Sequence, residues 1–307
     1  MRRASAFVPG HISGFFQVCD EFKELERRGS RNCGPCITAG VKTEVRVSPS
    51  TRSRVSVFIN GQRAPKARTS LTAARSILEE VPDSLGVEIH HTTRVPIGAG
   101  YGLSGAGAAG VALALSDALD LNFPRSKVAS VAHRAEVMCG TGLGDVGPQM
   151  IGGLVVGLEP GAPPYGRWDQ IEVPRGLRIV CGTIGTLRTE RFLGDPAFRR
   201  RTKKLGSRAL EELKGDLSPR NFMRVSYEFA KGMELVDGEL DRVIEGVSCL
   251  SSFGASMVML GRAVFTLAKE SEVRKVKLAY SKFIDPASIF VAKVDFYYSS
   301  HQYRAYG

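Results

Sequence analysis

Residues 96–110 read PIGAGYGLSGAGAAG, and the prediction of the fold starts from this stretch. It holds six glycines around one serine, Ser104. Glycine lets a backbone press closely against a ligand, but within a helix it costs about 1 kcal/mol relative to alanine. Gly105, Gly107 and Gly110 should therefore be compensated by the close approach of a ligand or of a neighbouring helix.

Three ways of binding a phosphate can be compared with this stretch. The P-loop needs Gly-Lys-Ser/Thr, and the chain contains no Gly-Lys pair. The dinucleotide fingerprint GxGxxG is matched, but a Rossmann site places its glycines after the first strand and an acidic residue at the end of the second. Here several β-like segments come before the glycines, and Asp117 and Asp120 fall within the following helix. Neither of these designs fits.

The third design is a glycine-rich loop that runs directly into the N-terminus of a helix. There the unpaired backbone N–H groups and the helix dipole favour an anion. We expect Ser104 at or near the N-cap, where its oxygen can accept from a backbone N–H or turn to a metal or a phosphate. A plain capped helix in a tightly packed core is the alternative that this stretch alone leaves open.

Hydrophobic patterning on both sides of the stretch predicts an α+β fold. Strands are predicted at 5–8, 36–47, 54–60, 87–93 and 151–160, and helices at 70–81, 104–119 and 125–138. The segment GAPPYG (161–166) is the predicted boundary between domains at 1–160 and 167–307. Beyond it we expect a strand at 177–184, helices over 196–247, and strands at 255–260 and 287–298. Neither half shows a regular βαβ alternation, which argues for α+β.

Length and composition bound the class of protein. A chain of 307 residues with 43% hydrophobic residues is long enough for about two domains. No apolar run approaches the roughly 20 residues that cross a bilayer, and Pro9 and His11 interrupt the N-terminal apolar stretch too early for a signal peptide. The six cysteines are spread along the chain, and Cys33-Gly-Pro-Cys36 is one CxxC pair without a second. We expect a soluble, cytoplasmic protein with reduced thiols.

The chain is also strongly basic. Its net charge of +11 (42 − 31) favours anionic partners, without choosing between nucleic acid, phosphate compounds and small carboxylates. The densest basic run is FRRRTKKLGSR (198–208), in which no aromatic residue follows Phe198. A solvated helix face or a surface loop is the simpler interpretation of this run. A nucleic-acid-binding protein that uses it is the alternative from another functional class.

The glycine-rich stretch resembles the second motif of the GHMP kinases, usually written P-x-x-x-G-L-G-S-S-A-A. Four positions after Pro96 match the motif: Gly100, Gly102, Ser104 and Ala106. Three positions depart from it: Tyr101, Leu103 and Gly105. AFVPGHISG (6–14) resembles the strand leading into Pro-Gly in the N-terminal motif of the superfamily, and FGASMVMLG (253–261) is a faint echo of its C-terminal motif.

This resemblance implies a fold and a cofactor. The GHMP kinase fold has an N-terminal α+β domain with the glycine-rich phosphate loop and a C-terminal ferredoxin-like domain. ATP would be held by the residues of the loop: Pro96, Gly98, Gly100, Gly102, Leu103, Ser104, Gly105 and Ala106. Four segments also resemble the archaeal pantoate kinases, a branch that phosphorylates pantoate on the way to coenzyme A: 6–16, 27–41, 140–153 and 255–261.

A second group of candidate functional residues lies in AHRAEVMCGTGLGDV (132–146), a segment that ends a predicted helix and continues into a glycine-rich loop. His133 and Glu136 are three residues apart, so both can point into one cleft. The resemblance implies that Glu136 binds Mg²⁺ together with Ser104 and that Asp145 is the catalytic carboxylate. Phosphoryl transfer needs such groups, because the charge of the phosphates has to be neutralised and the acceptor hydroxyl oriented. The residues alone leave open a solvent-facing Glu136 and an Asp145 that only stabilises a turn.

The resemblance also implies a substrate site for pantoate. Ser30 and His133 would contact the substrate, and Arg28 and Arg31 add positive charge for its carboxylate. One departure falls at Gly157, where the resemblance leads us to expect an arginine. Either Arg28 or Arg31 takes over that task, or the acceptor differs.

We therefore expect an ATP- and Mg²⁺-dependent kinase whose acceptor is pantoate. The alternative within the superfamily is a kinase for another small hydroxy acid or for an isoprenoid alcohol. We expect no nucleic acid and no membrane among its partners, and a homodimer as the candidate assembly.

Overall fold

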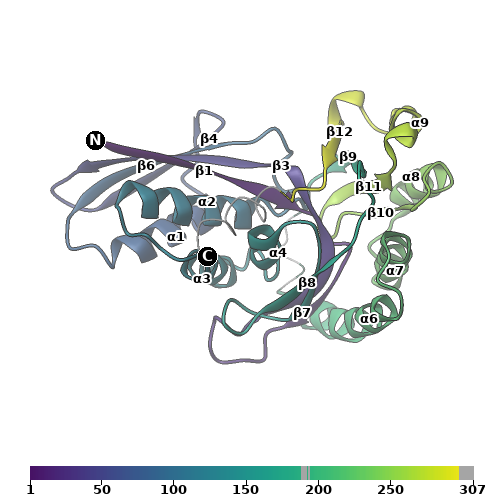
Figure 1. Ribbon diagram of the computed structural model, residues 1–307, viewed down its shortest axis with the longest axis horizontal. Helices are drawn as coiled ribbons and strands as arrows, with labels where there is room; N and C mark the ends of the chain where they lie inside the picture. Colours follow the sequence, from purple (N-terminus) through teal and green to yellow (C-terminus); the bar gives the residue numbers. More distant parts are fainter. Residues whose placement is uncertain (188–191, 193, 297–307) are drawn as a thin grey trace.

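Two β-sheets organise the chain in this computed structural model, which describes residues 1–187, 192 and 194–296 (Figure 1). The first sheet has the strand order β5-β4-β6-β3-β7-β8, and β1 and β2 also pair with β3. Its strands are β1 (Arg2–His11), β2 (Phe15–Cys19), β3 (Gly29–Pro49), β4 (Arg54–Ile59), β5 (Gln62–Arg63), β6 (Leu85–Thr92), β7 (Leu154–Glu159) and β8 (Arg167–Ile171).

The second sheet has the order β10-β11-β9-β12, with every neighbouring pair antiparallel. Its strands are β9 (Arg178–Gly185), β10 (Ala255–Met257), β11 (Arg262–Ala268) and β12 (Ile289–Lys293). Helices separate β9 from β10 and β11 from β12. This is the βαββαβ order of a ferredoxin-like fold, so the predicted α+β class and the ferredoxin-like second part are confirmed.

Strand β3 is the central strand of the first sheet and pairs with four other strands, β1, β2, β6 and β7. It runs for 21 residues; its second half pairs with β1 and β6, and its first half pairs with β2 and β7. Opposite Gly40 the register shifts between Pro9 and Gly10, and a shift of this kind bends a strand. Beyond this bend, Ser30 and Asn32 at the start of β3 lie against Gly144 in the loop before α4 (Val146–Ile151), and Gly14, just after β1, lies against α7 (Pro219–Gly232).

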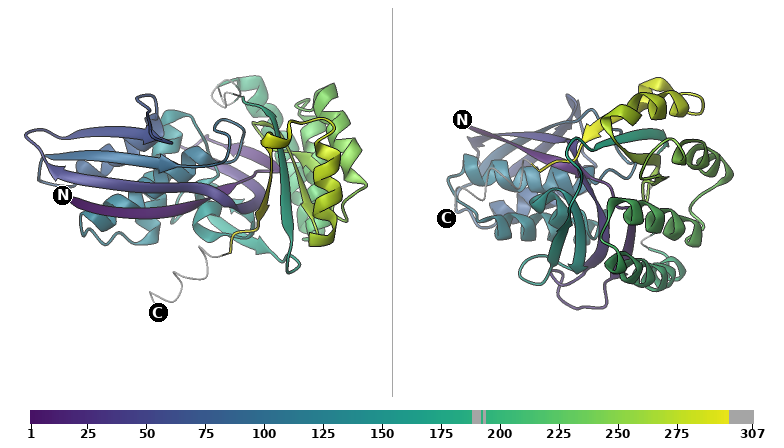
Figure 2. Two further views of the ribbon diagram at one scale, coloured as in Figure 1. Left: turned by 90° about the horizontal axis from the view of Figure 1, so that it is seen from above. Right: turned by 45° about the vertical axis from the view of Figure 1, so that its right-hand side comes forward.

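Four helices pack beside the first sheet, on one side of it (Figures 1 and 2). They are α1 (Arg68–Leu78), α2 (Leu103–Ala118), α3 (Arg125–Cys139) and α4 (Val146–Ile151). The core beneath them combines aliphatic side chains of the strands and helices, such as Val45, Ile89 and Leu115, all fully buried. Nearly every residue of α2 is buried, because sheet and helices surround it. This explains why its sequence lacks a polar face.

The glycines of α2 are compensated by neighbouring elements. A Cβ at Gly107 would contact Ser70 of α1 and His91 of β6, at 3.4 and 3.5 Å from their nearest atoms. A Cβ at Gly110 would overlap the side chain of Thr43 in β3. The expected close approach is therefore supplied by α1 and the sheet, which let α2 lie against the strands.

Replacing Gly110 with alanine should lower the free energy of unfolding by about 1–3 kcal/mol, the usual cost of overpacking a core. Helix propensity alone would predict the opposite sign. Urea denaturation measures the change, and Gly238→Ala is the matched control, because a Cβ at this first residue of α8 has no atom within 4 Å. Equal stability of Gly110→Ala and the wild type would contradict this packing.

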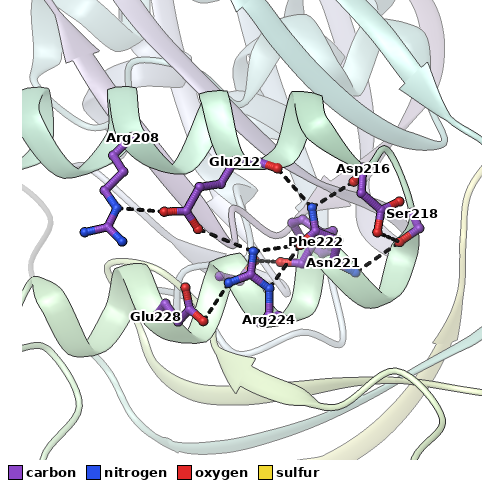
Figure 3. A network of polar contacts seen from close by, with 9 residues as sticks. Arg208, Glu212, Asp216, Ser218, Asn221, Phe222, Arg224 and Glu228 are labelled. Atoms are coloured by element: carbon purple, nitrogen blue, oxygen red, sulfur yellow. Dashed lines mark hydrogen bonds and ion pairs between the residues drawn. The ribbon is translucent and has the colours of Figure 1, made fainter.

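The helices of the second half lie at the end of the molecule farthest from the N-terminus (Figure 1). They are α6 (Pro196–Gly215), α7 (Pro219–Gly232), α8 (Gly238–Ser248), α9 (Glu270–Tyr280) and the short 3₁₀ helix η1 (Pro286–Ser288). A polar network joins α6 to α7 (Figure 3). Asn221 donates to the carbonyls of Glu212 and Asp216 at 3.1 and 2.8 Å, and Arg224 contacts the Glu212 carboxylate at 3.3 Å. These contacts fix the tight turn between the two helices.

The two halves are joined through the backbone as well as through side chains. Asp295, just after β12, donates its N–H to the carbonyl of Cys36 at 2.9 Å and accepts from the N–H of Gly153 at 2.8 Å. On the other side the N–H of Met259 donates to the carbonyl of Ser13 at 3.1 Å. Residues that follow β10 thereby reach the segment between β1 and β2.

Several predicted boundaries differ from the structure. The change from the first sheet to the second follows Ile171 and not 161–166, because β8 pairs with β7. The polar sequence RWDQI of β8 carries no strand pattern, and sequence patterns likewise do not predict β2, β5, β11, α4 and α9. Predicted strand 287–298 begins with η1 and continues as β12, and its residues 297 and 298 lie outside the described part of the chain.

Candidate active site

The glycine-rich loop, the first turn of α1 and the loop before α4 enclose a cleft of about 650 Å³. Residues of the second half close one side of it, with Leu187, Met259 and Leu260 among the lining side chains. Predicted residues of all three kinds line the cleft together: Ser30 for the acceptor, Ser104 for the metal, and Asp145 as the catalytic carboxylate. Segments from both sheets thus form one site.

The glycine-rich loop presents its backbone to the cleft. Gly98, Gly100 and Gly102 have positive φ angles of 78°, 87° and 66°, which side chains with a Cβ rarely adopt. All three line the cleft, together with Leu103. Among the predicted ATP-binding residues, the described cleft lining does not include Pro96, Gly105 or Ala106.

The N-cap of α2 is Gly102, and no side chain caps the helix. Ser104 lies two residues beyond this N-cap, near it as expected, but it does not accept from a backbone N–H. Its hydroxyl donates instead to Thr69 Oγ1 of α1 at 3.0 Å. An uncapped helix start carries free N–H groups and the positive end of the helix dipole. This end of α2 can therefore receive phosphate oxygens.

Gln149 of α4 holds the start of α2, a contact that no sequence pattern predicts. Its Nε2 donates to the carbonyl of Gly102 at 2.8 Å. A Cβ at Gly102 would lie 3.0 Å from Gln149 Nε2 and 3.2 Å from the carboxyl carbon of Asp145. A glycine is therefore required at position 102 for two reasons, its left-handed backbone and the close approach of α4.

Glu136 of α3 is directed inward. Its side chain is buried, and its Oε1 accepts a hydrogen bond from Thr141 at 2.7 Å. Burial raises the pKa of this carboxyl group to about 7, the charge of Asp145 adds to the rise, and the hydroxyls of Ser104 and Thr141 oppose it. Its second oxygen, Oε2, has no hydrogen-bond partner among the described residues. The solvent-facing alternative for Glu136 is wrong.

Asp145 is the N-cap residue of α4, but its side chain does not cap that helix. Its Oδ1 accepts a hydrogen bond from Nδ1 of His11 at 2.7 Å. His11 is fully buried at the end of β1, and Asp145 lines the cleft. The Asp145 carboxylate is therefore held by a hydrogen bond from the protein interior. Only the fold reveals the role of His11, because 134 residues separate it from Asp145 in the chain.

Ser30 and Asn32 of β3 lie opposite the loop that carries Asp145, and both line the cleft. Asn32 is buried and its Nδ2 donates to the carbonyl of Gly144 at 3.0 Å. A Cβ at Gly144 would overlap Ser30 Oγ and lie 2.7 Å from Asn32 Nδ2. The loop 141–145 can therefore reach β3 only because residue 144 is a glycine.

The other three predicted substrate residues point elsewhere. His133 is buried, and its Nε2 bonds to the carbonyl of Arg28 at 2.7 Å; desolvation lowers its pKa, so it is neutral and Nε2 carries the proton. The guanidinium of Arg28 donates to the carbonyls of Phe22 and Lys23 in its own loop. Neither these two residues nor Arg31 lines the cleft as described.

Gly157 faces the same end of the cleft. A Cβ there would lie 2.9 Å from Asn32 Oδ1 and 3.5 Å from the indole ring of Trp168, its partner residue in β8. The departure from the resemblance therefore falls beside Ser30 and Asn32. Of the residues described as lining the cleft, the positively charged ones are Lys66 and Arg68, at the start of α1.

Two other sequence features receive structural explanations. In the basic run, Arg199, Arg201 and Lys203 form ion pairs with Asp20, Glu234 and Glu21, at 2.6, 2.6 and 3.1 Å. The run is thus an ion-paired face of α6, as the simpler interpretation predicts.

Cys33 and Cys36 are both buried free thiols within β3. Side chains three apart in a strand point to opposite faces, so this CxxC does not form a joint metal or redox site.

Within the described part of the chain, no helix has the length and apolar character needed to span a membrane.

Comparison with known proteins places this cleft in a family. Residues 68–153 match the GHMP kinases N terminal domain. The pantoate kinase of Thermococcus kodakarensis is 32% identical over 276 residues, which are 89% of this chain and 90% of that protein. The pantoate kinase of Methanocaldococcus jannaschii is 30% identical over 267 residues, 86% of this chain and 92% of that protein.

A solved structure described as a phosphotransferase related to the CoA biosynthesis pathway is 27% identical to this chain. It superposes with a TM-score of 0.86 over 96% of both chains. The matched N-terminal segment contains the glycine-rich loop, Glu136 and Asp145. Because the similarity extends over nearly the whole chain, it includes the second, ferredoxin-like sheet as well. The protein therefore belongs to the pantoate kinase family of the GHMP kinase superfamily.

Proposed function

We propose that this protein transfers the γ-phosphate of ATP to a hydroxyl of pantoate, giving 4-phosphopantoate. The observation that carries the proposal is the similarity to pantoate kinases over 86–89% of the chain. The cleft supports it, since Ser30, Ser104 and Asp145 line one space beside the uncapped start of α2. The ATP phosphates would lie at this helix start and along the glycine-rich loop.

The donor atoms near α2 fit a magnesium ion. Mg²⁺ prefers oxygen ligands and usually takes one or two from the protein, the rest coming from water and phosphates. Glu136 Oε2 is a buried oxygen that lacks a partner among the described residues, and the Ser104 hydroxyl is a neighbouring oxygen. These two residues would hold the ion. Bound there, it would neutralise charge on the β- and γ-phosphates during transfer.

Asp145 would act on the acceptor. Its Oδ1 is bonded to His11, which leaves Oδ2 to receive the proton of the attacking hydroxyl or to orient that hydroxyl in line with the γ-phosphorus. The new bond joins the acceptor oxygen to phosphorus, and the bond to the β-phosphate oxygen breaks, releasing ADP. His11 would keep the carboxylate in one orientation throughout.

The acceptor carboxylate would lie near Ser30 and Asn32. The Arg28 guanidinium is bonded to carbonyls of its own loop, and Arg31 is not among the residues described as lining the cleft, so neither is a direct partner for that carboxylate in this arrangement. A hydroxyl donor at Ser30 can bind a carboxylate with a charge-assisted hydrogen bond. Because Gly157 replaces the expected arginine here, another small hydroxy acid is the second candidate acceptor.

Steady-state phosphorylation with labelled ATP tests the proposal directly. Pantoate is compared with mevalonate, homoserine and short 2-hydroxy acids at equal concentration, and ADP release is measured in parallel. We expect pantoate to have the highest kcat/KM of the set. Transfer to mevalonate or homoserine but not to pantoate would overturn the acceptor and leave the kinase assignment standing.

Replacing Ser30 with alanine should raise the KM for the acceptor about tenfold or more, the loss of one hydrogen bond to a charged group. The KM for ATP should change little, because Ser30 lies across the cleft at the acceptor end. The matched control is Ser5→Ala, an exposed serine of β1. Equal losses for both substrates would count against an acceptor site at Ser30.

A further inference from the structure

Three hydroxyl groups form a continuous chain between the two proposed metal ligands. The Ser104 hydroxyl donates to Thr69 Oγ1 at 3.0 Å, and Thr69 Oγ1 lies 2.9 Å from Thr141 Oγ1. The Thr141 hydroxyl then donates to Glu136 Oε1 at 2.7 Å. The four residues come from α2, α1, the loop after α3, and α3 itself. No motif in the sequence connects them.

The direction of the protons along this chain is fixed at both ends. A hydroxyl has one proton to donate and can accept two hydrogen bonds. Because Thr141 gives its proton to the carboxylate, the proton between the two threonines must come from Thr69. Because Thr69 gives its proton to Thr141, it can only accept from Ser104. When Glu136 is ionised, as a carboxyl group must be to bind a metal, every proton of the chain points towards it.

This direction determines which lone pairs stay free at each end. The Ser104 hydroxyl donates to Thr69 Oγ1 in this arrangement, and it also lies close enough to Glu136 to lower the pKa of that carboxyl group. With its proton on Thr69, the lone pairs of Ser104 Oγ can face a cation. At the other end Thr141 occupies Oε1 of Glu136, and Oε2 keeps no partner among the residues described. Both ends thus present oxygen lone pairs without a competing proton, as a hard divalent cation requires.

We infer that Thr69 and Thr141 are positioning residues for the metal site, and that Thr69 orients the Ser104 hydroxyl for coordination. They act through Ser104 and Glu136 and need not touch the metal. This inference rests on the proposed function, because it assigns the metal of that reaction to Ser104 and Glu136.

Thr69 is held rigidly enough for this task. Its side chain is buried in the first turn of α1. The next residue, Ser70, bonds to His91 Nε2 at 2.9 Å, and His91 Nδ1 bonds to Thr43 Oγ1 at 3.0 Å. Desolvation lowers the pKa of His91 to about 4, so this anchor stays uncharged and intact at neutral pH. The start of α1 is thereby tied to two strands of the sheet.

The test compares Thr69→Val, which keeps the shape but removes the hydroxyl, with Thr69→Ser, which restores it. Thr72→Val is the matched control: Thr72 lies on the same helix, and its hydroxyl faces Cys139 Sγ at 3.5 Å, away from the cleft. Calorimetry gives the Kd of a non-hydrolysable ATP analogue without metal and with Mn²⁺ in place of Mg²⁺. The ratio of the two constants measures how strongly the metal supports nucleotide binding, and no acceptor is needed.

We expect Thr69→Val to reduce this ratio about tenfold or more, the usual effect of removing a partner of a metal ligand. Its metal-free Kd should stay unchanged, which shows that the nucleotide site is intact. Thr69→Ser should restore most of the ratio, and Thr72→Val should keep it.

An unchanged ratio in Thr69→Val would overturn the inference, as would an equal loss in Thr72→Val or a failure of Thr69→Ser to restore the ratio. If pantoate proves not to be the acceptor, these ratios are unaffected, so the two failures can be told apart. If Mn²⁺ does not strengthen nucleotide binding to the wild type at all, both the metal site and the inference are wrong.

Discussion

Asp145→Asn should lower kcat by about 10² or more, the scale of losing a general base, while the protein folds and binds ATP as before. Asparagine keeps the size of the side chain and can still accept a hydrogen bond from His11 Nδ1, which lies 2.7 Å from Oδ1. What it loses is the negative charge and the ability to take up a proton. Steady-state kinetics with ATP and pantoate, together with the Kd for the ATP analogue, separates these two effects.

The matched control for this variant is Asp117→Asn, an exposed aspartate on α2 outside the cleft. It should have the kcat of the wild type. If folded Asp145→Asn also kept nearly wild-type kcat, Asp145 would not be the catalytic carboxylate. A parallel loss of nucleotide binding would instead indicate that the loop 141–145 had moved.

Glu136→Gln should make the metal-free protein more stable above pH 7, by about 3 kcal/mol, while impairing its use of Mg²⁺. Burial raises the pKa of Glu136 from 4.5 to about 7 in the folded protein, and each pKa unit corresponds to about 1.4 kcal/mol. The folded state therefore binds a proton that the unfolded state has already lost, so the stability of the wild type falls as the pH rises from about 4.5 to about 7.

Glutamine does not ionise, so the advantage of the variant should be absent below pH 4.5 and complete above pH 7. Urea denaturation in EDTA at pH 4.5 and at pH 8 measures it. The same variant should need more Mg²⁺ for half-maximal activity, because its side chain lacks the charge that would attract the ion. A stability difference that is the same at both pH values would refute the ionisation of a buried Glu136.

Local sequence patterns predicted the parts of this protein whose conformation depends on nearby residues. The glycines around Ser104 predicted a loop running into a helix, since their left-handed backbone angles and free N–H groups are properties of a short segment. The pattern of apolar residues predicts most strands and helices, although β3 begins at Gly29, seven residues before its predicted start. The resemblance of a few motifs to the GHMP kinases pointed to Glu136 and Asp145.

Packing between distant segments decided the rest. His11 is hydrogen-bonded to Asp145, and Thr69 is hydrogen-bonded to Ser104 and Thr141. These contacts form because β1, α1 and α2 lie side by side at the cleft. Equally, Arg28 and His133 point away from the cleft because the carbonyl groups of the loop before Ser30 satisfy them there. A hydrogen bond between residues far apart in the chain leaves no local pattern. Sequence motifs could therefore point to the candidate metal ligands Ser104 and Glu136 and to the candidate catalytic carboxylate Asp145, whereas the side chains that hold these groups in place follow from tertiary packing alone.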